Sequence, residues 1–182
     1  PAKVKAAFEQ IGFSYYSGGL ARMLQQRRRL RESGFINGQN ETQLGNNVRV
    51  PLVLGRYSNT SNSYSQTDFN NLLFGSNATG NMIQYYSEIS YAQFTLSGNT
   101  FGWFAVPQTQ EFYVGTSYGM EGGGARFARD LVVSGDATVD FSRFDSDGDG
   151  YVDVAMIVHT GAGGEVQANN IWSHRWNFND AH

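Results

Sequence analysis

The spacing of apolar residues predicts strands in the first half of the chain. The run VRVPLVL at 48–54 is apolar and β-branched, which predicts a buried strand. Pro51 within this run has no backbone N–H, which indicates an edge strand or a bulge. The segment QFTLSGNTFGWFAV, residues 93–106, predicts a β-hairpin that turns at Gly98 and Asn99.

Helical patterns separate and follow these strands. Residues 66–74 and 81–89 have the apolar spacing of two short helices. Either Ser65 or Thr67 is expected to cap the N-terminus of the first of them. A glycine-rich stretch precedes a third helical pattern at about 125–133. The chain therefore mixes helices and strands along its length.

Two further strands are predicted towards the end of the chain, at 152–159 (VDVAMIVH) and 170–176 (NIWSHRW). Because helices and strands follow one another without an internal repeat, we predict an α/β or α+β domain built around one twisted sheet. We place this domain at 48–182. Residues 1–47 precede it as a leader, with an amphipathic helix predicted at 19–33 and a polar linker after it.

Composition and charge narrow the functional classes. The 182 residues are 40% hydrophobic and 14% aromatic, which is enough to bury the core of one domain. The net charge of −3 implies no broad basic face, so we expect no nucleic-acid partner. The absence of cysteine excludes disulfides and cysteine zinc ligands. No apolar run approaches the roughly 20 residues that span a bilayer, so we expect no membrane partner.

The segment DSDGDGYVD at 145–153 carries the most specific chemical signal. Aspartates at alternate positions converge when the backbone curls, and Ca²⁺ prefers six to eight such oxygens. We expect side-chain ligands from Asp145, Asp147 and Asp149, the carbonyl of Tyr151, and a direct or water-mediated contact from Asp153. The plainer alternative is a solvated acidic turn, but four carboxylates within nine residues repel one another unless a cation neutralises them.

This loop departs from the helix–loop–helix calcium template. Its twelfth position is Met156 in place of the bidentate glutamate, and a strand follows instead of a helix. A remaining ligand must come from elsewhere, and Asp140 and Glu165 are candidates. Mg²⁺ fits less well, because it tends to keep its waters.

No complete catalytic set is visible in the sequence. The three histidines are His159, His174 and His182, and neither H-E-x-x-H nor H-x-x-E-H occurs. The first two lie on predicted strands whose pairing could bring them together, and three histidines could make a zinc site. The plainer alternative is that isolated histidines near aromatic residues only pack and hydrogen-bond. There is no G-x-S-x-G turn and no phosphate-binding loop. We therefore assign no catalytic residue within this chain.

Five blocks of sequence follow one another in a characteristic order: VRVPLVLGRYSN (48–59), NLLFG (71–75), IQYYSEISYAQFTLSGNTFGW (83–103), VDFSRFDSDGDGYVDVAMIVHTGAGGE (139–165) and NIWSHRW (170–176). Together they resemble the immune inhibitor A family of secreted bacterial zinc metallopeptidases. The most specific features are the aspartate loop before a strand ending in His-x-Gly, and the string IWSHRW.

The resemblance implies a zincin-like fold in which this chain is the N-terminal lobe, a twisted mixed sheet with flanking helices and a calcium loop. It implies that residues 1–47 are the end of a propeptide and that the zinc-binding H-E-x-x-H helix comes after this chain. The parent would be a secreted zinc endopeptidase acting on proteins, and this chain, alone, would be inactive and pair with the rest of its catalytic domain. An edge strand, which we place at 170–176, would pair with substrate. The alternative is a calcium-dependent, non-catalytic binding or structural module.

Overall fold

The computed structural model describes residues 46–75, 77, 79–147 and 152–175. By their internal contacts the residues form two compact units. One unit comprises 42–107 and 130–160 and contains the whole described sheet, and the other includes 108–129 and 161–182.

The predicted leader at 1–47 lies almost entirely outside the described residues, so its helix at 19–33 stays a prediction. Within the part of the chain that is described, no helix is both long and apolar enough to cross a membrane.

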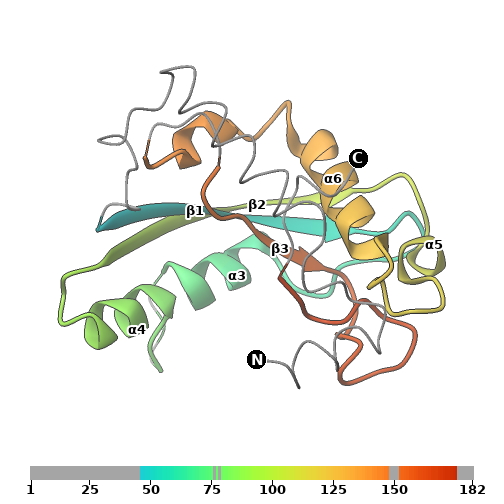
Figure 1. Cartoon of the computed structure of the whole chain (residues 1–182), viewed down its shortest axis with the longest axis horizontal. Coiled ribbons are helices and arrows are strands. Elements are labelled where there is room, and N and C mark those ends of the chain that lie inside the picture. The colour runs from blue at the N-terminus through green and yellow to red at the C-terminus, as the bar shows by residue number, and fades with distance from the viewer. Residues whose placement is uncertain (1–45, 76, 78, 148–151, 176–182) are drawn as a thin grey trace, which may run out of the picture. The chain divides into compact units, whose positions relative to one another are not determined.

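The sheet has three strands in the order β2-β1-β3 (Figure 1). They are β1 (Asn47–Arg56), β2 (Thr95–Ala105) and β3 (Met156–His159). β1 pairs in parallel with β2 over its whole length, and in parallel with β3 only from Leu52 onward. Parallel strands joined by helical connections confirm the α/β class. Both described pairings are parallel, however, in place of the mixed sheet that we expected.

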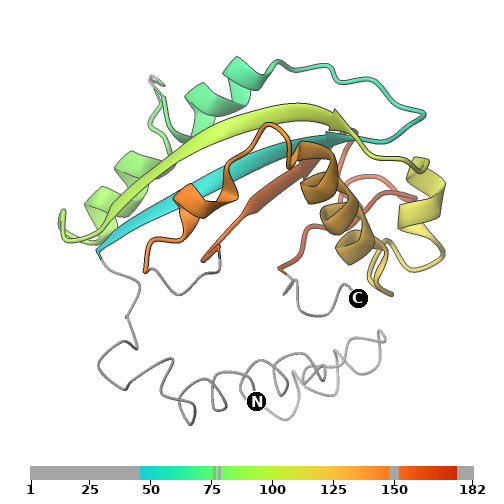
Figure 2. The same cartoon turned by 90° about the horizontal axis from the view of Figure 1, so that it is seen from above.

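Two short helices connect β1 to β2, α3 (Gln66–Leu73) and α4 (Met82–Ile89). Both lie on the same face of the sheet (Figure 2). Ser65, and not Thr67, is the N-cap of α3, because its hydroxyl accepts from the Asp68 backbone N–H at 3.2 Å. The Asp68 carboxylate in turn accepts from the Ser65 backbone N–H at 2.7 Å, which completes a capping box.

Alternating burial along β1 and β2 explains why α3 and α4 pack where they do. Val48, Val50 and Leu96 are buried on the face that the helices cover. Phe74, Met82, Phe94 and Met156 complete this core. On the opposite face, Phe101 of β2 meets Phe144 edge-on, with ring centroids 5.9 Å apart. Period-two alternation therefore gives the sheet two apolar faces, as expected for a parallel sheet covered on both sides.

The predicted hairpin at 93–106 is wrong, because β2 continues without a turn through Gly98 and Asn99. Gly98 serves close packing instead: a Cβ at this position would overlap the Phe74 ring and the Val50 carbonyl. A glycine followed by asparagine is a common turn signal, but here a neighbouring helix takes the space of the missing side chain.

The edge-strand interpretation of Pro51 is wrong for β1 as a whole, since β1 is the middle strand. The local geometry still explains the proline. The Gly55 carbonyl accepts from Thr160 on the β3 side, and the Arg56 carbonyl accepts from Val106 on the β2 side. By this alternation Pro51 faces the β3 side, one residue before pairing with β3 begins. No ladder bond is lost at that position.

The other unit contains α5 (Gln110–Val114) and the beginning of α6 (Gly123–Gly135), which confirms the helix predicted near 125–133. Tyr113 and Phe127 are buried and meet edge-on, with ring centroids 5.4 Å apart. A Cβ on Gly123 would overlap the Tyr113 carbonyl, so the glycine permits this close approach. The strand predicted at 170–176 is not formed over its described residues, 170–175.

Candidate metal centre

A short 3-10 turn, η1 (Phe141–Phe144), leads into the aspartate loop. Its N-cap is Asp140, whose carboxylate accepts from the backbone N–H of Ser142 at 3.2 Å and from its hydroxyl at 2.6 Å. Phe144 is buried against β2 and anchors the end of the turn. Asp145 is the C-cap of η1, so the backbone position of the first aspartate of the loop is set by this turn.

Backbone hydrogen bonds close the loop on itself. The Asp153 backbone N–H donates to the Phe144 carbonyl at 3.4 Å. The Ser146 backbone N–H donates to Oδ2 of Asp153 at 2.8 Å. The two ends of the loop are thus held together three residues before β3 begins at Met156. The strand predicted at 152–159 is confirmed only over its last four residues, because the loop uses the residues before them.

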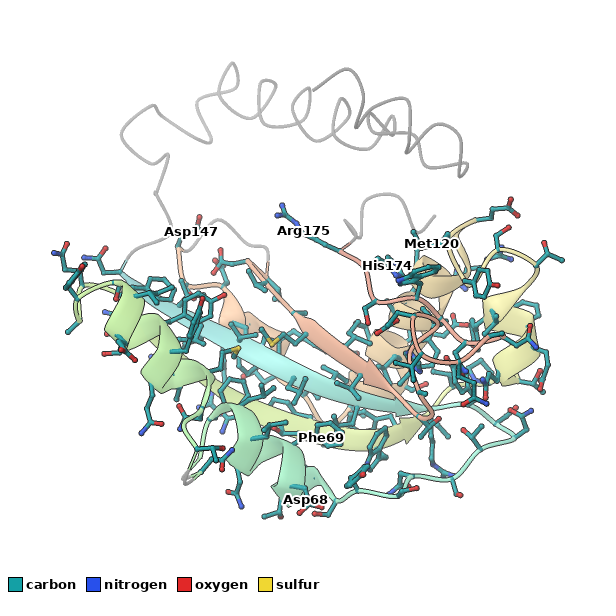
Figure 3. The ribbon with its side chains drawn as sticks, turned by 90° about the horizontal axis from the view of Figure 1, so that it is seen from below. Asp68, Phe69, Met120, Asp147, His174 and Arg175 are labelled. Atoms are coloured by element: carbon teal, nitrogen blue, oxygen red, sulfur yellow. The ribbon has the colours of Figure 1, made fainter. Side chains whose placement is uncertain are left out.

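This closure brings three carboxylates together. One oxygen from each of Asp145, Asp147 and Asp153 lies within 4.8 Å of the others, and all three residues are half-buried. Figure 3 marks Asp147 on this loop. Three like charges at this separation repel, and partial burial reduces the screening by water. A donor set made of carboxylate oxygens fits a hard cation such as Ca²⁺ and suits Zn²⁺ less well.

The other residues expected to bind the cation are not among the three clustered aspartates. Asp149 and Tyr151 lie outside the described residues. Asp140 is used as the cap of η1 and is absent from the cluster. Glu165 is also absent from it, and its carboxylate accepts from the backbone N–H of Ser173 at 3.2 Å and from its hydroxyl at 2.7 Å. Neither proposed source of a remaining ligand is therefore part of the described cluster.

The two described histidines have local structural contacts. Nδ1 of His159 lies 2.9 Å from the Thr160 carbonyl, and its ring lies 5.8 Å from that of Tyr57. Nδ1 of His174 lies 2.5 Å from the Trp172 carbonyl. Since a carbonyl can only accept, each of these hydrogen bonds requires the tautomer with a hydrogen on Nδ1. In the described parts of the chain, the aspartate cluster is the one grouping of three or more histidine, aspartate or glutamate ligands.

Each residue of the segment 171–174 lies against a residue of 118–124 or against Glu165. Sequence reasoning missed this packing. A Cβ on Gly119 would crowd Ile171 at 3.1 Å, and one on Gly124 would crowd the His174 ring at 2.6 Å. The Trp172 backbone N–H donates to the Tyr118 carbonyl at 3.1 Å. Figure 3 marks His174. Ser173 donates to the Glu165 carboxylate through both its backbone N–H and its hydroxyl. The glycines at 119, 124 and 164 are the sequence signal that could have indicated this packing.

Comparison with known proteins identifies the family. The sequence profile described as "Immune inhibitor A peptidase M6, catalytic domain" matches residues 54–182, which is most of the chain. The chain belongs to this peptidase family, as its motifs indicated. The match includes the aspartate loop, β3 and the segment 171–174.

Two curated relatives show how much of a complete protein this chain represents. Immune inhibitor A from Bacillus thuringiensis subsp. alesti is 32% identical over 51% of this chain and 17% of its own length. The pre-pro-metalloprotease PrtV from Vibrio cholerae serotype O1 is 28% identical over 65% of this chain and 16% of its own length. The chain therefore spans less than a fifth of the length of either relative.

Proposed function

We propose that this chain is the N-terminal lobe of the catalytic domain of a zinc metalloendopeptidase that hydrolyses peptide bonds in proteins. The single observation that carries the proposal is the match of a catalytic-domain profile to residues 54–182. The parallel α/β sheet agrees with a lobe of this kind. The name of one relative, a pre-pro-metalloprotease, supports protein substrates, and the pre- and pro-segments in that name support a secreted location.

The proposal places the zinc site outside these 182 residues. H-E-x-x-H is absent from the sequence, and the described residues offer no ligand group apart from three aspartates. Zinc, where such a helix binds it, polarises the scissile carbonyl and activates a water molecule. This chain alone would then have no peptidase activity, and its partner would be the remainder of the same catalytic domain.

The same proposal gives the aspartate loop a calcium ion. Asp145, Asp147 and Asp153 would provide carboxylate ligands, joined by Asp149 and the carbonyl of Tyr151. The support is the convergence of three half-buried carboxylates with a D-x-D-x-D-G spacing. A bound cation would remove their mutual repulsion and stabilise the loop between η1 and β3.

A peptidase assay tests the zinc part of the proposal. The gene is sequenced beyond His182, and the full-length protein is assayed on casein with and without 1,10-phenanthroline. We expect an H-E-x-x-H motif, chelator-sensitive hydrolysis, and loss of hydrolysis when the motif glutamate is replaced by glutamine. A continuation without zinc ligands, or hydrolysis that ignores the chelator, would refute the zinc peptidase and favour the calcium-dependent binding module.

A further inference from the structure

Ser146 links the aspartate cluster to the central strand, because its backbone and its side chain each make a hydrogen bond. Its backbone N–H donates to Oδ2 of Asp153 at 2.8 Å. Its hydroxyl accepts from the backbone N–H of Arg49 in β1 at 3.1 Å. Both Arg49 and Ser146 belong to the same compact unit, and they are 97 residues apart in sequence.

The contact to Arg49 falls where β1 has no strand on its β3 side. Pairing with β3 starts at Leu52, so residues 47–51 face that side without a ladder in the described sheet. Odd-numbered residues of β1 direct their backbone groups to this side, as the bond from Thr160 to the Gly55 carbonyl shows. Unsatisfied backbone groups along a strand edge are costly or prone to wrong pairing.

Neither of the last two odd positions before Leu52 leaves a backbone N–H unsatisfied on this side. Pro51 has no N–H to satisfy. The Arg49 N–H is satisfied by Ser146 instead of by a strand. The aspartate loop therefore supplies, at Arg49, the acceptor that a neighbouring strand would otherwise provide. The residue that makes this contact also donates to a carboxylate of the cluster.

We propose that Ser146 is a positioning residue that couples cation binding in the aspartate cluster to the open edge of β1. The inference rests on the proposed calcium site. Calcium bound by Asp145, Asp147 and Asp153 fixes the carboxylate that holds the Ser146 backbone, and so fixes the hydroxyl that accepts from Arg49. Coupling is reciprocal, so the factor by which calcium strengthens this contact equals the factor by which the contact strengthens calcium binding.

Amide hydrogen exchange of the full-length protein, measured in Ca²⁺ and after EGTA, tests this coupling at single residues. We expect Ca²⁺ to slow exchange at Arg49 by about two- to tenfold, the range for the net worth of one hydrogen bond. The Val50 amide, which by the alternation of β1 faces β2, serves as the internal control and should change less.

Matched variants give a second measurement. Ser146→Ala should weaken Ca²⁺ affinity by about two- to tenfold and abolish the effect of Ca²⁺ on Arg49, whereas Ser146→Thr, which keeps the hydroxyl, should restore both. Ser142→Ala removes a hydroxyl that donates to Asp140, outside the described cluster, and the Ca²⁺ affinity of this variant should not change.

The outcomes separate two failures. Suppose that Ca²⁺ slows exchange of the loop amides at 145–147 but not of the Arg49 amide, and that Ser146→Ala binds Ca²⁺ as tightly as the parent. The proposed coupling is then wrong, and the proposed calcium site stands. If Ca²⁺ protects neither, the proposed calcium site and the coupling fall together. Exchange at Arg49 that rises in Ca²⁺ would also overturn the coupling.

Discussion

Two regions of the sheet-containing unit, the helix-covered core and the aspartate loop, are stabilised by opposite means. Val48, Val50 and Leu96 are buried under α3 and α4, and apolar burial needs no partner beyond the chain itself. At the loop, by contrast, Asp145, Asp147 and Asp153 are drawn together although their charges repel. The core should therefore be stable without any ion, whereas the geometry of the loop should depend on one.

Helix ends show the same contrast on a smaller scale. The carboxylate of Asp68 is balanced locally, because it accepts two hydrogen bonds from Ser65, one of them from the backbone. These bonds hold the pKa of Asp68 below its ordinary value of 3.8, the backbone bond being the larger cause. Donated hydrogen bonds stabilise the Asp68 carboxylate, whereas the cluster brings like charges together, which a bound cation would offset.

The largest expected effect comes from the core. Leu52 of β1 is 1% exposed, so Leu52→Ala should lower the free energy of unfolding by about 2–5 kcal/mol, with or without Ca²⁺. Leu72→Ala is the control, since Leu72 is 52% exposed and should cost far less. Urea unfolding of the parent and both variants, in Ca²⁺ and in EGTA, measures the loss in free energy of unfolding. A Leu52→Ala loss that appears only in EGTA would contradict the independence of the core.

Removal of calcium should have the next largest effect. An ion present at 100 times its dissociation constant stabilises the folded state by about 2.7 kcal/mol, so EGTA should lower the melting temperature by several degrees. Asp147→Asn should remove most of this shift in melting temperature. Asp136→Asn is the control, because it removes the same charge at an exposed position outside the cluster, and it should keep the shift. Differential scanning calorimetry reads the shift, and an equal response to EGTA in all three proteins would argue against the site.

Removal of the α3 cap should cost less. Ser65→Ala deletes the side-chain acceptor of the Asp68 N–H and should destabilise the fold by about 1 kcal/mol. Thr67→Ala, the other expected cap position, should cost little, because Ala favours helix and Thr67 is exposed. Chemical denaturation of both proteins compares them. Equal losses at the two positions would mean that the cap is not Ser65.

The smallest effect is a pH dependence at the same cap. Because the folded pKa of Asp68 lies below 3.8, the ionised carboxylate stabilises the fold fully above pH 3.8, and this contribution is lost as pH falls through the folded pKa. Asp68→Asn should therefore be less stable than the parent near neutral pH, with the gap closing in acid. Urea midpoints between about pH 6 and pH 3 test this, and a gap that widens in acid would reverse the sign.

Local patterns were sufficient where a residue's neighbours in sequence determine its structure. The strand at 48–54, the helices at 66–74 and 81–89, and the convergence of Asp145, Asp147 and Asp153 all follow from periodicity, capping residues and loop spacing. The family was also readable, because its motifs are contiguous strings such as IWSHRW. Short-range rules act within a few residues, and these features need no more.

Features that depend on contacts between distant residues were decided by the tertiary structure alone. Gly98 reads as a turn but lies within β2, where the ring of Phe74, the C-cap of α3, occupies the space that a side chain would take. Pro51 reads as an edge residue but lies in the central strand, at the position where pairing with β3 has not yet begun. The bond from Arg49 to Ser146 spans 97 residues. No periodicity encodes such contacts, because their geometry exists only once the strands and helices have packed together.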